Sequence, residues 1–167
     1  MAARILVAYA SPRGSTAEIA QAVGKELRSA GHSADVAEIK TVSSLAGYHA
    51  VVIGGPMYMG KMVGDVGKFV GKHREVLMTL PVAAFIVGLA PVSKNQVDFD
   101  YTMKALHTAI APLQPVIEIV FAGRVDPAKL SFIQRWMVNK AKTPVGDFRD
   151  WDAIAGWARE LPGKLGL

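Results

Sequence analysis

The chain has 167 residues, 51% of them hydrophobic and 20% charged, which is typical of one globular domain with a substantial core. It contains no cysteine, and this excludes disulfides, thiolate metal sites and cysteine nucleophiles. Its 19 Lys and Arg against 14 Asp and Glu give a net charge of +5, which favours acidic partners. The first ten residues are too short to span a membrane and lack a signal-peptide cleavage pattern, so we expect a cytoplasmic location.

Apolar runs along the chain predict five strands. They lie at 4–10, 33–39, 49–55, 82–90 and 116–123. The first, third and fourth are almost continuously apolar, as in strands that are covered on both faces. Helical patterns alternate with these strands, at 15–31, 61–77, 97–113 and 150–165. The alternation predicts a single α/β domain over 1–167: a three-layer, doubly wound fold whose five-stranded parallel sheet has the order 2-1-3-4-5.

The loop after the first predicted strand concentrates groups that bind anions. Ser11, Ser15 and Thr16 supply hydroxyl donors, Arg13 supplies a fixed positive charge, and Gly14 permits a tight turn. A helix is predicted to begin here, and its first N–H groups also attract anions. The loop matches neither G-x-x-x-x-G-K-[ST] nor G-x-G-x-x-G, so it predicts a site for a monophosphate.

A purely structural role for this loop stays open. Ser15 and Glu18 have the spacing of a capping box, so Ser15 can serve as a helix cap while Arg13 is solvated. The two roles are compatible, because backbone N–H groups can carry much of the phosphate binding.

Two further loops follow the third and fourth predicted strands and offer contacts for a flat ring. In the first of them, side chains supply apolar surface, a glycine supplies backbone freedom and a lysine supplies a cation beside the ring. These candidates are Pro56, Met57, Tyr58, Met59, Gly60 and Lys61. In the second loop, Gly88, Leu89 and Ala90 can approach a ring through backbone atoms. The alternative is that Tyr58 and the methionines merely cover the edge of the sheet.

The first loop resembles the phosphate loop of the flavodoxin family, S/T-x-x-G-x-T, at Ser11, Gly14 and Thr16. The resemblance implies FMN as the cofactor. Gly60 stands at the position of the family's glycine that changes its peptide orientation when flavin N5 gains hydrogen. Met59 stands where the family usually has an aromatic residue, so both Met59 and Tyr58 are candidates for contact with the ring.

The order of the loops, "FAGRVD" at 121–126, the basic segment after it and "RDWDAIAGWARE" near the end resemble menaquinone-dependent protoporphyrinogen oxidases. This resemblance implies an FMN-dependent oxidoreductase that passes electrons between a reduced substrate and a quinone-like acceptor. The alternative is a flavodoxin-type electron carrier without a substrate of its own. A flavin-free domain like a response regulator is disfavoured, because no acidic cluster follows the first strand. Carrier flavodoxins are generally acidic, so the net charge of +5 favours the enzyme.

The basic excursion at 124–149 is a candidate docking surface for an anionic membrane or an acidic protein, which would place the protein at the inner membrane face. Its cations are Arg124, Lys129, Arg135, Lys140, Lys142 and Arg149, against Asp126 and Asp147. Leu130, Ile133 and Met137 share one stripe if this segment is helical. The alternative is that the stripe packs on the sheet edge and the cations are solvated. No nucleic-acid motif is present, and the four histidines lack metal-ligand spacing, so we expect neither nucleic acid nor a metal.

Overall fold

The centre of the protein is a parallel sheet with the strand order β2-β1-β3-β5-β6. The computed structural model describes residues 2–12, 14–126, 133, 136 and 145–167. The five strands are β1 (Arg4–Tyr9), β2 (Ser33–Glu38), β3 (Ala50–Tyr58), β5 (Val82–Gly88) and β6 (Ile117–Ala122). In chain order these are the five predicted strands, so the predicted order 2-1-3-4-5 is confirmed.

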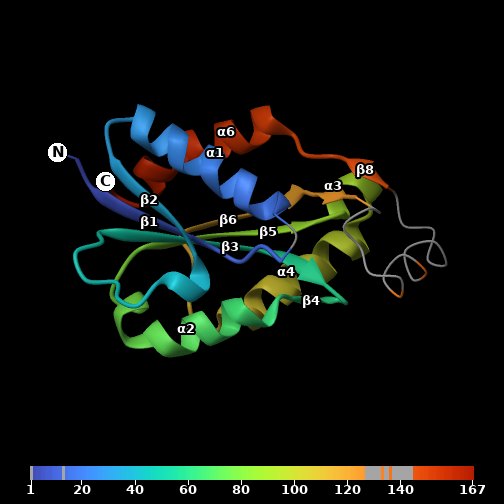
Figure 1. Cartoon of the computed structure of the whole chain (residues 1–167), viewed down its shortest axis with the longest axis horizontal. Coiled ribbons are helices and arrows are strands. Elements are labelled where there is room, and N and C mark those ends of the chain that lie inside the picture. Colours follow the sequence, from blue (N-terminus) through green and yellow to red (C-terminus); the bar gives the residue numbers. More distant parts are fainter. Residues whose placement is uncertain (1, 13, 127–132, 134–135, 137–144) are drawn as a thin grey trace.

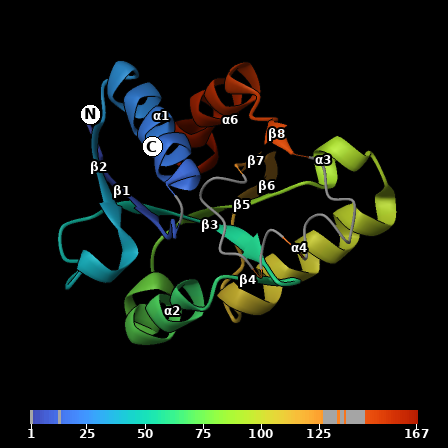
Figure 2. The same cartoon turned by 45° about the vertical axis from the view of Figure 1, so that its right-hand side comes forward.

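Helices cover both faces of the sheet (Figure 1). The helices α1 (Ser15–Ser29) and α6 (Trp151–Lys164) lie on one face. The helices α2 (Gly64–Leu77) and α4 (Gln96–Ile110) lie on the other. Turning the molecule shows the sheet between the two pairs of helices (Figure 2), which confirms the three-layer architecture.

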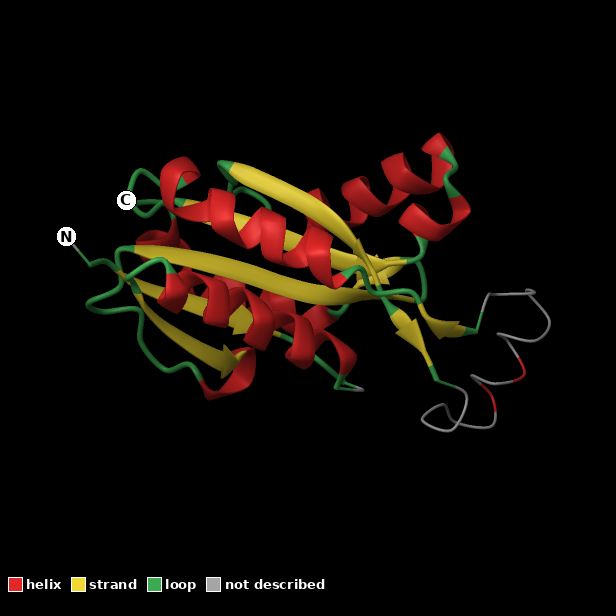
Figure 3. Cartoon of the chain, turned by 90° about the horizontal axis from the view of Figure 1, so that it is seen from above, coloured by secondary structure: helices red, strands yellow, loops and turns green. Residues whose placement is uncertain are grey.

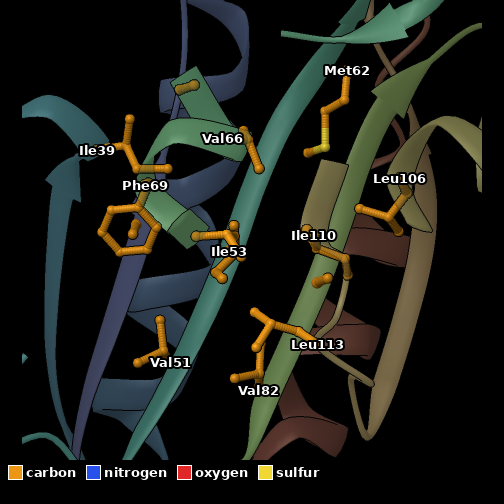
Figure 4. Packing of buried hydrophobic residues seen from close by; sticks show 14 of the residues in the cluster. Ile39, Val51, Ile53, Met62, Val66, Phe69, Val82, Leu106, Ile110 and Leu113 are labelled. Carbon is orange, nitrogen blue, oxygen red and sulfur yellow. The ribbon is translucent and has the colours of Figure 1, made fainter. Parts of the chain in front are cut away.

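Alternate residues of the buried strands pack into two separate hydrophobic cores, one on each face of the sheet. In β1, Ile5 and Val7 pack toward α1 and α6, whereas Leu6 packs toward α2 and α4. Phe69 and Leu106 complete the second core from the helices (Figure 4). This two-sided burial is the physical reason why the sequences of β1, β3 and β5 are almost continuously apolar.

The remaining elements are short. They are the 3-10 helix η1 (Ile39–Thr41), the helix α3 (Ala90–Ser93) and the strands β4 (Lys61–Met62), β7 (Arg124–Val125) and β8 (Gly146–Asp147). Strand β4 pairs antiparallel with the end of β3, and β7 pairs antiparallel with β8.

The end of β3 differs from the prediction. The third strand was expected to stop at residue 55 and a helix to begin at 61, but β3 continues to Tyr58 and α2 begins only at Gly64. Between them β3 and β4 form a hairpin whose two turn residues, Met59 and Gly60, have φ angles of +53° and +78°. Two consecutive positive φ angles are typical of a type I′ turn, which matches the twist of a hairpin.

The two edges of the sheet are occupied differently. Both termini lie at the amino edge of the sheet, whereas the start of α1, the β3–β4 hairpin and α3 lie at the carboxyl edge (Figures 1 and 3). In open α/β sheets, ligands bind at the carboxyl edge. Among the helices that the structure describes, none is both long and apolar enough to cross a membrane.

Candidate functional site

The first candidate loop connects β1 to α1 directly. Gly14 is the N-cap of α1 with a φ of +87°, and no side chain caps the helix at that position. The Ser11 hydroxyl accepts a hydrogen bond from the backbone N–H of Ala17 at 3.1 Å, and Thr16 is buried. Ser11, Gly14, Ser15 and Thr16 are therefore gathered at the start of α1, where an anion is favoured. Arg13, the remaining candidate in this loop, lies outside the described residues.

The capping box proposed for this loop is wrong. Ser15 is already the first residue of α1, because Gly14 is the residue with the non-helical conformation. The Glu18 carboxylate instead accepts a hydrogen bond from Nη1 of Arg149. Only Gly14 can take the left-handed conformation here without a steric penalty on Cβ, so the helix starts one residue earlier than a Ser15 cap requires.

The second candidate loop is the β3–β4 hairpin, which pairs Met57 with Met62 and Tyr58 with Lys61. Its base is fixed by α4, because the Thr102 hydroxyl lies 3.6 Å from the Met57 sulfur. Tyr58 is 40% exposed and Met59 is 63% exposed. Both side chains are therefore accessible at the surface, while Met57 is half-buried against the core.

The turn of this hairpin lies against α4. A Cβ atom built on Gly60 would be 2.6 Å from the hydroxyl oxygen of Tyr101, closer than real Cβ contacts. A side chain here would require the Tyr101 hydroxyl to shift, and it would be strained by the φ of +78°, which favours glycine. Tyr101 thus lies beside the turn and is 55% exposed.

The third candidate loop contacts the second. Gly88 ends β5, and a Cβ atom there would lie 3.8 Å from Cβ of Met57. Leu89 caps the short helix α3, and Ala90 is the first residue of that helix. Pro56 in β3 is the register partner of Val87 in β5, so the two loops leave the sheet side by side.

The three loops meet at one edge. The backbone N–H of Ala10 donates to the carbonyl of Gly54 at 2.9 Å, so the first loop leaves β1 beside the middle of β3. Strand β3 continues past this point as the hairpin. The arrangement fits a ligand with an anionic group at the start of α1 and an apolar ring near the hairpin. Both Gly14 and Gly60 have positive φ angles; a Cβ atom on Gly14 would meet no atom within 4 Å, whereas one on Gly60 would meet the Tyr101 hydroxyl.

The structure adds Arg149, which sequence analysis counted only among the docking cations of 124–149. Its side chain is 4% exposed and its guanidinium bonds Asp147, Glu18 and the carbonyl of Ser15. Hydrogen bonds from Arg149 lower the pKa of Asp147 to about 2. For Arg149 the docking role is wrong, because it is buried in an internal ion-pair cluster. No local sequence pattern could have found this contact, since 131 positions separate Arg149 from Glu18.

Most of the excursion cannot be compared with the prediction. Residues 127–132, 134–135 and 137–144 lie outside the described residues, and these include Lys129, Leu130, Arg135, Met137, Lys140 and Lys142. Ile133 and Trp136 are exposed. Within the described part of the chain, no group of three His, Asp or Glu side chains could hold a metal ion.

Comparison with known proteins gives the family. Residues 6–152 match the flavodoxin domain family, and the chain belongs to this family. The protoporphyrinogen IX dehydrogenase [quinone] of Escherichia coli strain K12 is 26% identical over 172 aligned positions, which cover 95% of this chain and 94% of the relative.

Solved flavodoxins have the same fold. A flavodoxin of Streptococcus pneumoniae TIGR4 superposes with a TM-score of 0.60 at 20% identity, covering 97% of this chain and 99% of the other. The Fusobacterium nucleatum flavodoxin, described as bound to flavin mononucleotide, gives a TM-score of 0.58 at 13% identity, covering 98% of this chain and 99% of the other. At such identities the likeness shows the fold alone.

Proposed function

We propose that this protein is a single flavodoxin-like domain over 1–167 that binds FMN non-covalently and passes electrons between a reduced substrate and a quinone-like acceptor. The observation that carries the FMN proposal is the meeting of three loops at the carboxyl edge of the sheet. The Fusobacterium flavodoxin that shares this fold is described as bound to flavin mononucleotide. FMN, when bound, supplies two-electron redox chemistry.

The first loop is assigned to the phosphate of FMN. The start of α1 presents backbone N–H groups and the positive end of the helix dipole. Ser11, Ser15 and Thr16 add hydroxyls, Arg13 adds a permanent charge, and Gly14 keeps the approach to the helix open. A phosphate dianion is favoured by each of these groups.

The ring is assigned to the hairpin and the third loop. Met57 and Pro56 support the hairpin from the sheet, and Tyr58 or Met59 supplies the exposed apolar contact. Backbone atoms of Gly60 and of the residues 88–90 are assigned to the polar edge of the ring. Lys61 follows the turn, and its positive charge favours the negative charge that a flavin gains on reduction.

The substrate class follows from the Escherichia coli relative, which is named a protoporphyrinogen IX dehydrogenase acting with quinone. Its match extends over almost the whole length of both chains. We therefore propose a porphyrinogen-like reduced substrate and a quinone acceptor. The basic charge of +5 supports this role over that of an electron carrier.

The cofactor proposal is tested on the purified protein. Mass spectrometry of the released chromophore should give FMN rather than FAD. Arg13→Ala should weaken the binding of FMN more than the binding of riboflavin, because the Arg13 guanidinium is assigned to the phosphate, which riboflavin lacks. A colourless protein that takes up no FMN on titration would contradict the proposal. Equal losses for both ligands would remove Arg13 from this role.

The reaction is tested by steady-state reduction of menaquinone with protoporphyrinogen as the electron donor. Turnover that requires both compounds supports the enzyme. We also expect the fully reduced state to form at a less negative potential than in acidic carrier flavodoxins, because Lys61 and the basic protein stabilise negative charge. Absence of turnover together with a very negative final reduction step would support the carrier instead.

We further propose that the excursion 124–149 docks on an anionic membrane surface. Exposed Ile133 and Trp136 support an apolar contact beside the cations of this segment. Co-sedimentation with anionic liposomes should be sensitive to salt and should be lost in Arg135→Glu/Lys140→Glu/Lys142→Glu, with FMN retained. Wild-type protein that stays in the supernatant at low salt would contradict membrane docking.

A further inference from the structure

Arg149 is the buried centre of an ion-pair cluster at the carboxyl edge of the sheet. Its side chain is 4% exposed, whereas Arg159, which pairs with Glu26 further along α1, is 67% exposed. Burying a guanidinium costs free energy unless all of its donors find partners. Arg149 therefore occupies a position where its exact bonding geometry matters, unlike a surface cation.

The two sides of the Arg149 guanidinium bind different partners. Its Nε and Nη2 donate to the two carboxylate oxygens of Asp147 at 2.9 and 2.8 Å. Its Nη1 donates to the Glu18 carboxylate and, at 3.4 Å, to the carbonyl oxygen of Ser15. Because the guanidinium is a rigid planar fork, it fixes the first turn of α1 relative to β8.

The chain around Arg149 is itself held in place. The backbone N–H of Phe148 donates to the carbonyl of Gly123 at 3.1 Å, and the Asp150 carboxylate caps α6 by accepting from Ala153 at 3.0 Å. The guanidinium also lies 4.8 Å from the centre of the Trp151 ring. The fork thus connects the first turn of α1 to a fixed part of the framework, the junction of β8 with α6.

The negative charge of Glu18 in the first turn of α1 explains why the contact between Arg149 and this turn affects the binding of an anionic ligand. Glu18 lies in the first turn of α1, whose opening residues form the candidate phosphate loop. An uncompensated carboxylate there would repel a phosphate dianion and occupy the positive end of the helix dipole. The positive charge of Arg149 offsets Glu18 at the point where its fork also holds the carbonyl of Ser15.

We infer that Arg149 is a positioning residue for the cofactor phosphate: it holds the first turn of α1 in place and offsets part of the negative charge of Glu18 beside the candidate phosphate loop. The inference rests on the proposed binding of FMN. It concerns the phosphate alone, so it predicts a difference between FMN and riboflavin, which has the same ring and lacks the phosphate.

The test measures the dissociation constants of FMN and riboflavin for the flavin-free full-length protein and its variants. Arg149→Met should raise the Kd of FMN about tenfold or more and leave that of riboflavin within about threefold. Arg149→Met/Glu18→Gln should recover most of the lost FMN affinity, because it removes the repelling charge. Arg149→Lys, which keeps the charge without the fork, should fall between wild type and Arg149→Met. Arg159→Met is the matched control: it breaks the ion pair between Glu26 of α1 and Arg159 of α6 and should change neither constant.

The outcomes separate the inference from the proposed function. Wild-type protein that binds no FMN contradicts both. Wild-type binding with equal losses of FMN and riboflavin in Arg149→Met, or no recovery on adding Glu18→Gln, overturns the role of Arg149 and leaves FMN binding intact. Thermal unfolding of each flavin-free variant shows which are folded. If Arg149→Met does not fold, the same comparison is made with Arg149→Lys, and an unchanged ratio of the two constants then overturns the inference.

Discussion

The two edges of the central sheet differ in the backbone strain and the exposure of their residues. At the amino edge, side chains bond one another. Arg4 pairs with Asp35 at 2.9 Å, Tyr48 donates to the same carboxylate at 2.7 Å, and the Arg4 guanidinium lies 4.5 Å from the centre of the Tyr48 ring. Even the backbone N–H of Arg4 is bonded, to Nδ1 of His49 at 2.9 Å. At the amino edge, these polar groups are therefore hydrogen-bonded to one another.

The carboxyl edge also has a cluster of bonded side chains, around Arg149, but it adds a non-glycine residue with a positive φ angle and exposed apolar side chains. Gly14, Met59 and Gly60 all have positive φ angles, and Tyr58 and Met59 are exposed there. For Met59, which is not a glycine, this conformation costs free energy in the ligand-free protein, and such residues are common at binding sites. The comparison teaches that the described polar side chains of the amino edge bond one another, whereas the carboxyl edge combines such bonds with a strained residue and exposed apolar side chains.

One glycine at each edge allows the comparison to be tested, with the largest effects expected. Gly47 at the amino edge and Gly60 at the carboxyl edge both have positive φ, +85° and +78°. Gly47→Ala and Gly60→Ala should each lower the free energy of unfolding by about 1–2 kcal/mol, because an L-residue resists this conformation. Only Gly60→Ala should also weaken FMN binding, by about tenfold or more, since the strain at a φ of +78° alters the hairpin turn that is assigned to the ring.

Urea titrations of the flavin-free proteins measure the first effect, and fluorescence titration with FMN measures the second. Gly47→Ala serves as the control, because its methyl group meets only Nη1 of Arg4, at 3.3 Å. If both variants weakened FMN equally, the two edges would not have separate roles.

A smaller effect is expected from Asp35→Asn at the amino edge. Hydrogen bonds from Tyr48 and then Arg4 hold the pKa of Asp35 below its ordinary value. The ionised carboxylate therefore stabilises the folded state at pH values above its ordinary pKa, and this contribution is lost as the pH falls through the lowered one. Asp35→Asn should cost about 1 kcal/mol at neutral pH, since the exposed pair is screened by solvent.

The measurement is the free energy of unfolding against pH, from neutral pH to about pH 3. The wild type should lose stability below about pH 4, and Asp35→Asn should lose less over the same range. The FMN affinity should not change, because Asp35 lies at the opposite edge from the three loops. Parallel pH profiles for the two proteins would show that Asp35 contributes nothing through its charge.

Much of this architecture could be predicted from local sequence. The apolar runs of β1, β3 and β5 indicate strands buried on both faces, and the alternation with helices fixes a parallel sheet. The loop with Ser11, Gly14 and Thr16 lies between β1 and α1 as expected, because these residues directly follow β1 and no long-range contact is needed to locate them. The sheet then brings the second and third loops to the same edge.

The rest depends on contacts that local patterns do not encode. Strand β4 has only two residues, and its turn is Met-Gly rather than the Asn-Gly that favours a type I′ hairpin. In the sequence, Arg149 is one of several cations in a basic segment, and its partner Glu18 is 131 positions away. Tertiary structure alone reveals that this charge is buried and paired.

The smallest expected effect concerns the strain at the carboxyl edge itself. Met59 has a φ of +53°, a conformation that asparagine tolerates better than methionine, so Met59→Asn should stabilise the flavin-free protein by about 0.5 kcal/mol. Lys94, with the same φ of +53° at the end of α3, provides the matched variant Lys94→Asn, which should give a similar gain without changing FMN binding. Differential scanning calorimetry should show melting temperatures raised by about 1–2 °C in both. If Met59 is the side chain that contacts the flavin ring, Met59→Asn should also weaken FMN and riboflavin equally. Unchanged affinity for both ligands would assign that contact to Tyr58, the other exposed apolar side chain of the hairpin.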